Sequence, residues 1–321
     1  MKAAVEARNL FKSFSGGAVG VAGLDLSVPS GTIYGLIGRN GSGKTTTLRL
    51  LMGLLRADQG QAHILGENMW TAKRALRQQI AYVSQNLQTP GWMTPRELFR
   101  YTASFYDEWD RGFADGMAKR WGIPMDRAIG HLSGGQQRQA SVIAALAARP
   151  KVLLLDEPAG GLDAVVRRQL LEAIVDLAMD DFGCTVLFST HYIGDLERVA
   201  EHVGMLDRGR ITLSARSEDL LTKMKRVQVV FDQAEVPSGF RIPGARCTEI
   251  AGPVARGIVH LEEEAVLDSI REIKGIRIHT FPLNLEEIFV ELYGGNLSEA
   301  KDEPVDTRGL DPGVFEEISE S

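Results

Sequence analysis

Residues Gly38-Arg39-Asn40-Gly41-Ser42-Gly43-Lys44-Thr45 fit the pattern G-x-x-x-x-G-K-[ST], which is typical of a loop that holds nucleotide phosphates. Glycines let backbone N–H groups approach phosphate oxygens, and the lysine supplies a positive charge to the β- and γ-phosphates. A threonine hydroxyl at the last position is a ligand that Mg²⁺ accepts. This stretch predicts that the chain binds ATP or GTP together with Mg²⁺.

The residues on either side of the loop support the same interpretation. Residues 32–37 are apolar and predict a buried strand, and residues 46–52 predict a helix whose positive end faces the phosphates. We expect the nucleotide to be bound by Gly38, Asn40, Gly41, Ser42, Gly43, Lys44, Thr45 and Thr46.

Composition limits the class of protein. The 321 residues carry a formal net charge of −6, which gives no electrostatic case for binding nucleic acid or an anionic membrane surface. No apolar run approaches the ~20 residues that a transmembrane helix needs, and early charges argue against a signal peptide. Cys184 lies in an apolar strand and is expected to be a reduced core residue. These features predict a soluble, cytoplasmic protein.

The pattern of elements predicts an α/β fold. Apolar strands at residues 152–155 and 184–188 are separated by an amphipathic helix at 167–178, which favours a mainly parallel sheet covered on both faces. Short strand-like segments broken by glycines lie between residues 5 and 28. Residues 86–148 read as a helical insertion, in which Thr94-Pro95-Arg96-Glu97 combines a capping box with an N-terminal proline.

The C-terminal third changes in pattern. Strands are predicted at residues 227–231, 257–261 and 276–281, and helices at 217–225, 262–273 and 285–293. We expect a nucleotide-binding core over residues 3–215, a small α+β domain over 226–294, and a disordered acidic tail over 295–321.

A second motif follows the strand at 152–155, which ends in the adjacent carboxylates Asp156 and Glu157. Side chains at the carboxyl end of a parallel strand reach the crevice in which nucleotides bind. Asp156 is therefore expected to hold Mg²⁺ through a water, and Glu157 to polarise the attacking water as a general base.

A third motif is Leu132-Ser133-Gly134-Gly135-Gln136. Ser133 is expected to cap a helix running from about residue 137 to 148, and the two glycines leave N–H groups open at the positive end of that helix. The motif predicts a second anion site, made by Ser133, Gly134, Gly135 and Gln136, that is separate from the first loop.

With these three motifs in this order, residues 3–215 resemble the nucleotide-binding subunits of ABC transporters. This implies a P-loop ATPase core in which an antiparallel β subdomain and a helical insertion accompany the mainly parallel sheet. The resemblance implies that two subunits sandwich two ATP molecules head to tail, each signature motif facing ATP held by the other subunit. The partner ATPase would be an identical chain or a close paralogue. It also implies a separate integral membrane permease, which would hold the ATPase at the inner face of the cell membrane.

Further family positions match residue by residue. Gln85 matches the glutamine that joins Mg²⁺ and water to the helical subdomain, and His191 the histidine that contacts the γ-phosphate. Asp163 matches the loop that crosses the dimer interface, although Ala159 and Gly160 replace a threonine and a serine common in the family. Phe14 matches the aromatic residue that stacks on adenine.

The C-terminal segment is similar to that of bacterial ABC-2-type exporter ATPases, most of all the drug and antibiotic-peptide group. Two alternatives stay open: an importer ATPase, and a non-transport ABC ATPase acting on ribosomes or DNA. The chain lacks the second cassette or long coiled coil usual in the non-transport class. Aromatic residues of the helical insertion, among them Trp92 and Phe105, either receive the permease or form the insertion's own core.

Overall fold

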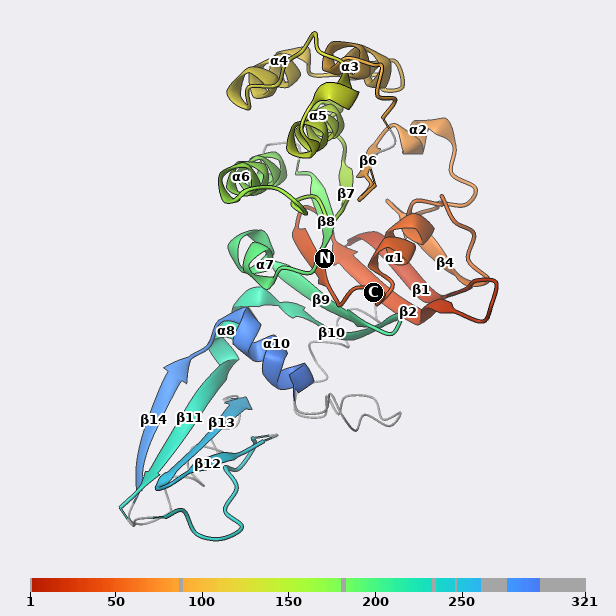
Figure 1. The fold of residues 1–321 in the computed structure, drawn as a ribbon. Helices are drawn as coiled ribbons and strands as arrows, with labels where there is room; N and C mark the ends of the chain where they lie inside the picture. Colours follow the sequence, from red (N-terminus) through yellow and green to blue (C-terminus); the bar gives the residue numbers. More distant parts are fainter. Residues whose placement is uncertain are drawn as a thin grey trace. The chain divides into compact units, whose positions relative to one another are not determined.

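The computed structural model describes residues 2–86, 89–179, 183–232, 235–245, 247–260 and 276–294. It divides into two compact units, Met1–Ser214 and Ala215–Ser321 (Figure 1). None of the helices in these described ranges is both long and apolar enough to span a membrane.

A six-stranded sheet forms the centre of the first unit, with the strand order β10-β9-β3-β8-β7-β6. Strands β9, β3, β8, β7 and β6 pair in parallel, as the run of apolar strands and intervening helices predicted. Every residue of β3, β7 and β8 is buried, because both faces of this part of the sheet are covered. The strands are β3 (Ile33–Ile37), β6 (Ile80–Val83), β7 (Val152–Asp156), β8 (Thr185–Thr190), β9 (His202–Asp207) and β10 (Arg210–Arg216).

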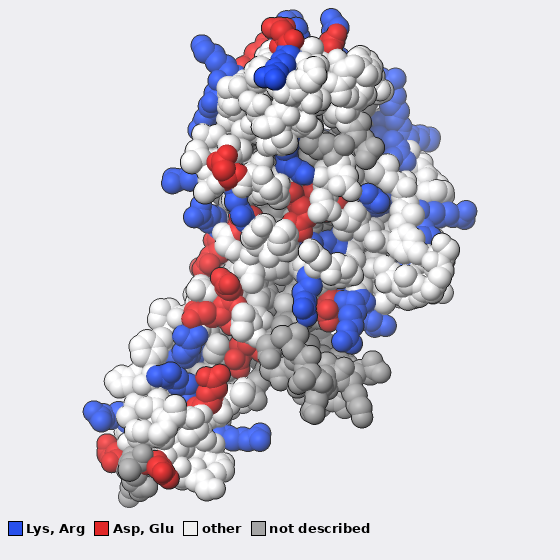
Figure 2. Space-filling view, in the orientation of Figure 1, with Lys and Arg blue, Asp and Glu red and all other residues white. Residues whose placement is uncertain are grey.

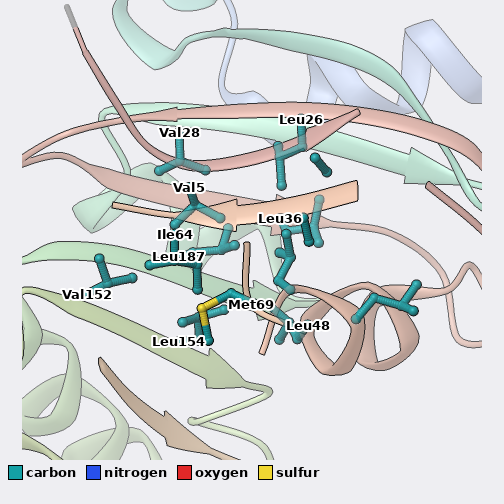
Figure 3. Packing of buried hydrophobic residues seen from close by; sticks show 14 of the residues in the cluster. Val5, Leu26, Val28, Leu36, Leu48, Ile64, Met69, Val152, Leu154 and Leu187 are labelled. Carbon is teal, nitrogen blue, oxygen red and sulfur yellow. The ribbon is translucent and has the colours of Figure 1, made fainter. Parts of the chain in front are cut away.

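A second, antiparallel sheet in this unit has the order β2-β1-β4-β5 and confirms the predicted β subdomain. Its strands are β1 (Ala3–Ser13), β2 (Val19–Pro29), β4 (Gln59–Ile64) and β5 (Glu67–Asn68). Apolar side chains of both sheets and of helix α1 (Lys44–Leu51) meet in one core, in which Val5, Leu36, Leu48 and Leu154 are all buried (Figure 3).

The helical insertion contains α3 (Pro95–Ala103), α4 (Arg111–Arg120), the 3₁₀ turn Ile129–His131 and α5 (Gly134–Ala147), and α3 and α4 gather around α5 in Figure 1. The predicted capping box at Thr94 and Glu97 is formed. Helix α5 begins at Gly134, about three residues earlier than expected, because Ser133 closes a capping box of its own with Gln136. The remaining helices of the unit are α2 (Arg74–Arg77), α6 (Ala164–Met179) and α7 (Ile193–Val199).

The second unit is an α+β unit in the residues described. Its antiparallel sheet has the order β12-β13-β11-β14 and a small core that includes Val227, Val229 and Phe231. Its elements are α8 (Ser217–Lys223), β11 (Met224–Phe231), β12 (Glu249–Ala251), β13 (Val254–His260), β14 (Ile276–Pro282) and α10 (Leu285–Gly294). The helix expected at 262–273 and the tail expected at 295–321 lie outside the described residues.

Candidate active site

The phosphate-type loop connects β3 to α1, as the flanking pattern predicted. Two of its glycines are required by close packing. A side chain on Gly43, whose φ is +108°, would collide with the carbonyl oxygen of Gly20. One on Gly38 would collide with the Ser42 hydroxyl and the carbonyl of Leu206. The loop therefore keeps its backbone open at the N-terminus of α1, where N–H groups attract anions.

Lys44 places a buried positive charge beside this loop. Its side chain is only 7% exposed, and its Nζ donates to the carbonyl of Gly38 at 2.6 Å. The same Nζ lies 3.3 Å from Oε1 of Glu157. The Ser42 hydroxyl is buried and has no hydrogen-bond partner within the described ranges, so a polar ligand at the loop would find both a cation and an unsatisfied hydroxyl.

Asp156 is the last residue of β7 and is fully buried. Strand register places it beside Ser189 of β8, whose hydroxyl donates to Asp156 Oδ1 at 2.8 Å. The other carboxylate oxygen, Oδ2, is buried without a hydrogen-bond partner in the described part of the chain. A buried carboxylate oxygen left in this state fits a cation or an ordered water that approaches from the loop.

Glu157 has an unusual backbone and a side chain with two partners. Its φ is +51°, in the left-handed region that non-glycine residues rarely occupy. Its N–H donates to the hydroxyl and to the carbonyl of Ser189, at 3.0 and 3.2 Å. Oε2 lies 2.7 Å from Nδ1 of His191, while Oε1 faces Lys44. This backbone conformation turns the Glu157 carboxylate toward the Lys44 ammonium group and the His191 ring.

His191 and Gln85 follow the ends of β8 and β6, which lie on either side of β7. His191 is partly exposed and its ring packs against Tyr192 at a centroid distance of 4.0 Å. The Gln85 side chain is exposed, and its backbone carbonyl accepts a hydrogen bond from Arg138 at 2.6 Å. Gln85, Glu157 and His191 thus follow the carboxyl ends of three adjacent parallel strands and lie on the same side of the sheet's strand ends.

The signature residues lie at the exposed start of α5. Ser133 Oγ accepts from the N–H of Gln136, and Gln136 Oε1 accepts from the N–H of Ser133, both at 3.2 Å. Ser133 and Gly134 are exposed, Gly135 and Gln136 are partly exposed, and a side chain placed on Gly135 would contact Leu162. The start of α5 is therefore open to solvent at Ser133 and Gly134.

Two further residues that the sequence singled out, Asp163 and Phe14, lie at the start of α6 and near Thr46. The Asp163 carboxylate accepts from the N–H groups of Val165 and Val166, both at 3.0 Å, and so caps the start of α6. Phe14 is 43% exposed and lies next to Thr46, since a side chain on Gly20 would touch both of them.

Two residues of the site were missed by sequence reasoning. Ser189 is a hydroxyl in an otherwise apolar strand, one strand over from Asp156, and Arg138 lies five residues after the signature serine. In the sequence, the one signal for Ser189 is a polar residue within an apolar strand. The one signal for Arg138 is a charged residue on an Ala-rich helix.

Comparison with known proteins decides the family. The ABC transporter ATP-binding protein YtrB of Bacillus subtilis is 31% identical over 294 residues, covering 91% of this chain and 98% of the relative. A family model described as ABC transporter matches residues 21–160. The chain belongs to the ABC transporter ATP-binding proteins. This ABC protein is thus an ATPase subunit of a transporter, which confirms the resemblance inferred from the motifs.

Other relatives of the ABC protein are named for resistance or transport. The daunorubicin/doxorubicin resistance ATP-binding protein DrrA of Streptomyces peucetius is 32% identical, covering 69% of this chain and 68% of the relative. The bacitracin transport ATP-binding protein BcrA of Bacillus licheniformis is 28% identical, covering 92% and 99%. A dimeric ATP-binding cassette in a post-hydrolysis state with ADP and Pi matches with a TM-score of 0.60 and 22% identity, covering 66% and 98%. This likeness confirms the cassette fold.

Proposed function

We propose that this ABC protein hydrolyses Mg²⁺-ATP in a head-to-tail dimer and thereby drives a separate membrane permease that exports its substrate. The observation that carries the proposal is the position of Glu157. Its buried carboxylate lies between Lys44 and His191 and directly follows Asp156.

The residues present fit Mg²⁺. Among the residues that the structure describes, Asp156 Oδ2 is a buried oxygen without a hydrogen-bond partner, and Thr45 and Gln85 add a hydroxyl and an amide oxygen. Among the described residues, no group of three or more His, Cys, Asp and Glu side chains could enclose a metal alone. Mg²⁺ commonly takes one or two protein ligands together with substrate phosphates and waters, so a sparse site of this kind suits it. When bound, Mg²⁺ would neutralise charge on the β- and γ-phosphates.

The protein's own groups then have separate tasks. Backbone N–H groups of residues 38–46 bind the phosphates, and Lys44 pairs with their charge. Glu157 accepts a proton from the attacking water, while His191 orients Glu157 through their 2.7 Å contact and reaches the γ-phosphate. Gln85 positions the water from the neighbouring strand.

Exposed residues support a dimer that completes each site. Ser133 and Gly134 present a capped helix N-terminus to the outside, which suits phosphate on a neighbouring subunit. Val165, an apolar residue that is 66% exposed, lies two residues after Asp163, in the segment proposed to cross the dimer interface. Phe14 would stack on the adenine ring. One copy of each motif per chain requires a second copy of this chain or a close paralogue.

The helical insertion supports a permease partner, and the relatives support export as the direction of transport. Trp92 is 73% exposed and Phe105 is also exposed, so these two aromatic side chains are available to a partner and do not form the insertion's own core. The relatives named for drug resistance, bacitracin transport and Nod factor export favour an exporter. The ATPase would then lie at the cytoplasmic face of the membrane, held there by the permease.

A nucleic-acid partner is not part of the proposal. On the face of the ATPase unit drawn in Figure 2, positive side chains lie at the top, the left and the right-hand edge, and negative side chains interrupt them at the top, the left and the centre. Binding to a phosphate backbone requires a continuous positive surface, and the chain as a whole is acidic.

The test is the Glu157→Gln variant, which keeps the shape of the side chain and removes its charge. Loss of a general base should lower the rate of ATP hydrolysis by about 10²- to 10⁴-fold. The variant should also form a stable dimer with Mg²⁺-ATP in size-exclusion chromatography, and retain an integral membrane protein from solubilised membranes. The matched control, Lys44→Ala in the same background, should stay monomeric. Hydrolysis at the wild-type rate, or a soluble ribosome-bound complex in place of a permease, would contradict the proposal.

A further inference from the structure

Arg138 connects two parts of the active site that lie far apart in the sequence. It lies on α5, and its Nη2 donates to the carbonyl of Gln85 at 2.6 Å. Its Nη1 donates to the carbonyl of Glu157 at 3.3 Å. The two carbonyls follow the ends of the adjacent strands β6 and β7. A planar guanidinium can serve both at once, since its N–H groups are held in a rigid fork.

The surroundings of Arg138 make this contact more than a surface hydrogen bond. The side chain is half-buried, and burial lowers the pKa of its guanidinium while the nearby carboxylates of Asp156 and Glu157 raise it. The guanidinium remains charged, because even a lowered arginine pKa stays far above neutrality. Its position beside the two carboxylates adds a charge attraction to the two hydrogen bonds.

At the Glu157 end, Arg138 contributes to a strained conformation. A left-handed φ is unfavourable for a non-glycine residue such as Glu157 and persists only where its neighbours hold it in place. Ser189 holds the N–H of Glu157, and Gly160 N–H and Arg138 hold its carbonyl. Arg138 is thus one of the groups that keep the catalytic carboxylate turned toward Lys44.

At the other end, Arg138 is fixed to the signature motif. It is the fifth residue of α5, and Ser133 and Gln136 close the first turn of the same helix through their capping box. The helix continues through the buried residues Val142, Ile143 and Leu146. A shift of the Arg138 backbone therefore moves Ser133 and Gly134 with it, because one helical segment carries all three.

We propose that Arg138 is a positioning residue that couples the two ATP sites served by one subunit: the site that its Gln85 and Glu157 act on, and the neighbour's site that its Ser133 and Gly134 close. The inference rests on the proposed head-to-tail dimer. Hydrolysis changes the backbone around Glu157 and Gln85, and the guanidinium passes that change to the start of α5. Cooperativity between the two ATP molecules then depends on Arg138.

The experiment compares Arg138→Gln and Arg138→Lys with Arg168→Gln. Arg168 is a suitable control because it is an exposed arginine on α6 that pairs with Glu172. The measurements are the ATP concentration dependence of hydrolysis and the equilibrium binding of ATP to monomer. A third measurement is the dissociation constant of the Mg²⁺-ATP dimer, determined in the Glu157→Gln background.

The wild type should hydrolyse ATP with a Hill coefficient above 1, and Arg138→Gln should bring this coefficient to about 1. Loss of a charge-assisted contact should weaken the dimer by about 10- to 100-fold. Binding of ATP to the monomer should change less than about twofold, since the phosphate-type loop keeps its contacts. Arg138→Lys restores the charge without the fork and should give intermediate values. Arg168→Gln should match the wild type.

Two results would overturn the coupling role. One is a Hill coefficient that is 1 in the wild type or the same in wild type and Arg138→Gln; the other is an unchanged dimer constant. A lower melting temperature without a change in either quantity would reduce Arg138 to a structural residue. If Glu157→Gln itself stays monomeric with Mg²⁺-ATP, the head-to-tail dimer fails, and that failure is distinguishable because it precedes any change at Arg138.

Discussion

The Ser189 hydroxyl donates to Oδ1 of Asp156 at 2.8 Å and thereby orients this buried carboxylate, and Ser189→Ala tests this directly. The substitution removes one buried donor to an ionised acceptor, which is worth about 1.5–3 kcal/mol. It also removes an acceptor from the N–H of Glu157, at a cost of about 0.5–1 kcal/mol, because that N–H keeps the Ser189 carbonyl. We expect the free energy of unfolding of the ATPase unit to fall by about 2–4 kcal/mol.

The assay is urea unfolding followed by tryptophan fluorescence. All four tryptophans precede residue 214, so their fluorescence reports the ATPase unit without a contribution from the second unit. A double-mutant cycle with Asp156→Ala isolates the hydroxyl–carboxylate term, and the coupling free energy should be about 1.5–3 kcal/mol. The stabilisation of the variant by Mg²⁺-ATP should also be smaller than that of the wild type, since Asp156 would no longer be held toward the proposed Mg²⁺ site.

Two results would refute this reasoning. A loss of less than about 0.5 kcal/mol in Ser189→Ala would mean that the carboxylate does not depend on the hydroxyl. Additivity of the two single substitutions within about 0.5 kcal/mol would show that they do not interact.

Three shorter predictions follow. Burial raises the pKa of the Cys184 thiol to about 12, so a thiol reagent at pH 8 should modify only the exposed Cys247 in the folded protein. In urea the reagent should modify both cysteines. Rapid modification of both thiols in the folded protein would contradict this prediction. Gly43→Ala should abolish ATP binding, measured by calorimetry, because a side chain there meets a backbone carbonyl at φ +108°. Hydrogen bonds from Lys12 and a backbone amide lower the pKa of Asp58 to about 2. The stability that Asp58 adds is therefore complete above pH about 4 and lost as the pH falls through about 2, so the difference in unfolding free energy from Asp58→Asn should close over that range.

Local patterns were enough to predict much of the fold. The buried strand and the helix around the phosphate-type loop were found, as β3 and α1, because apolar runs and helix starts depend on neighbouring residues. Strands β4 and β5 were not predicted, since β4 begins with three exposed residues and β5 has only two residues. Strand β4 forms because β1 offers it hydrogen bonds, and β5 forms because β4 does, which no local pattern records.

The sequence by itself determined the chemistry of this ABC protein: the phosphate-type loop, the Asp156–Glu157 pair and the signature cap each depend on residues within a few positions of one another. Only the tertiary structure decided which side chains hold them. Ser189 lies 33 positions from Asp156, and Arg138 lies 53 from Gln85 and 19 from Glu157. Strand register brings the first pair together, and the packing of α5 beside the ends of β6 and β7 brings the others. The left-handed backbone at Glu157, which turns its carboxylate toward Lys44 and His191, is held in place by these distant groups.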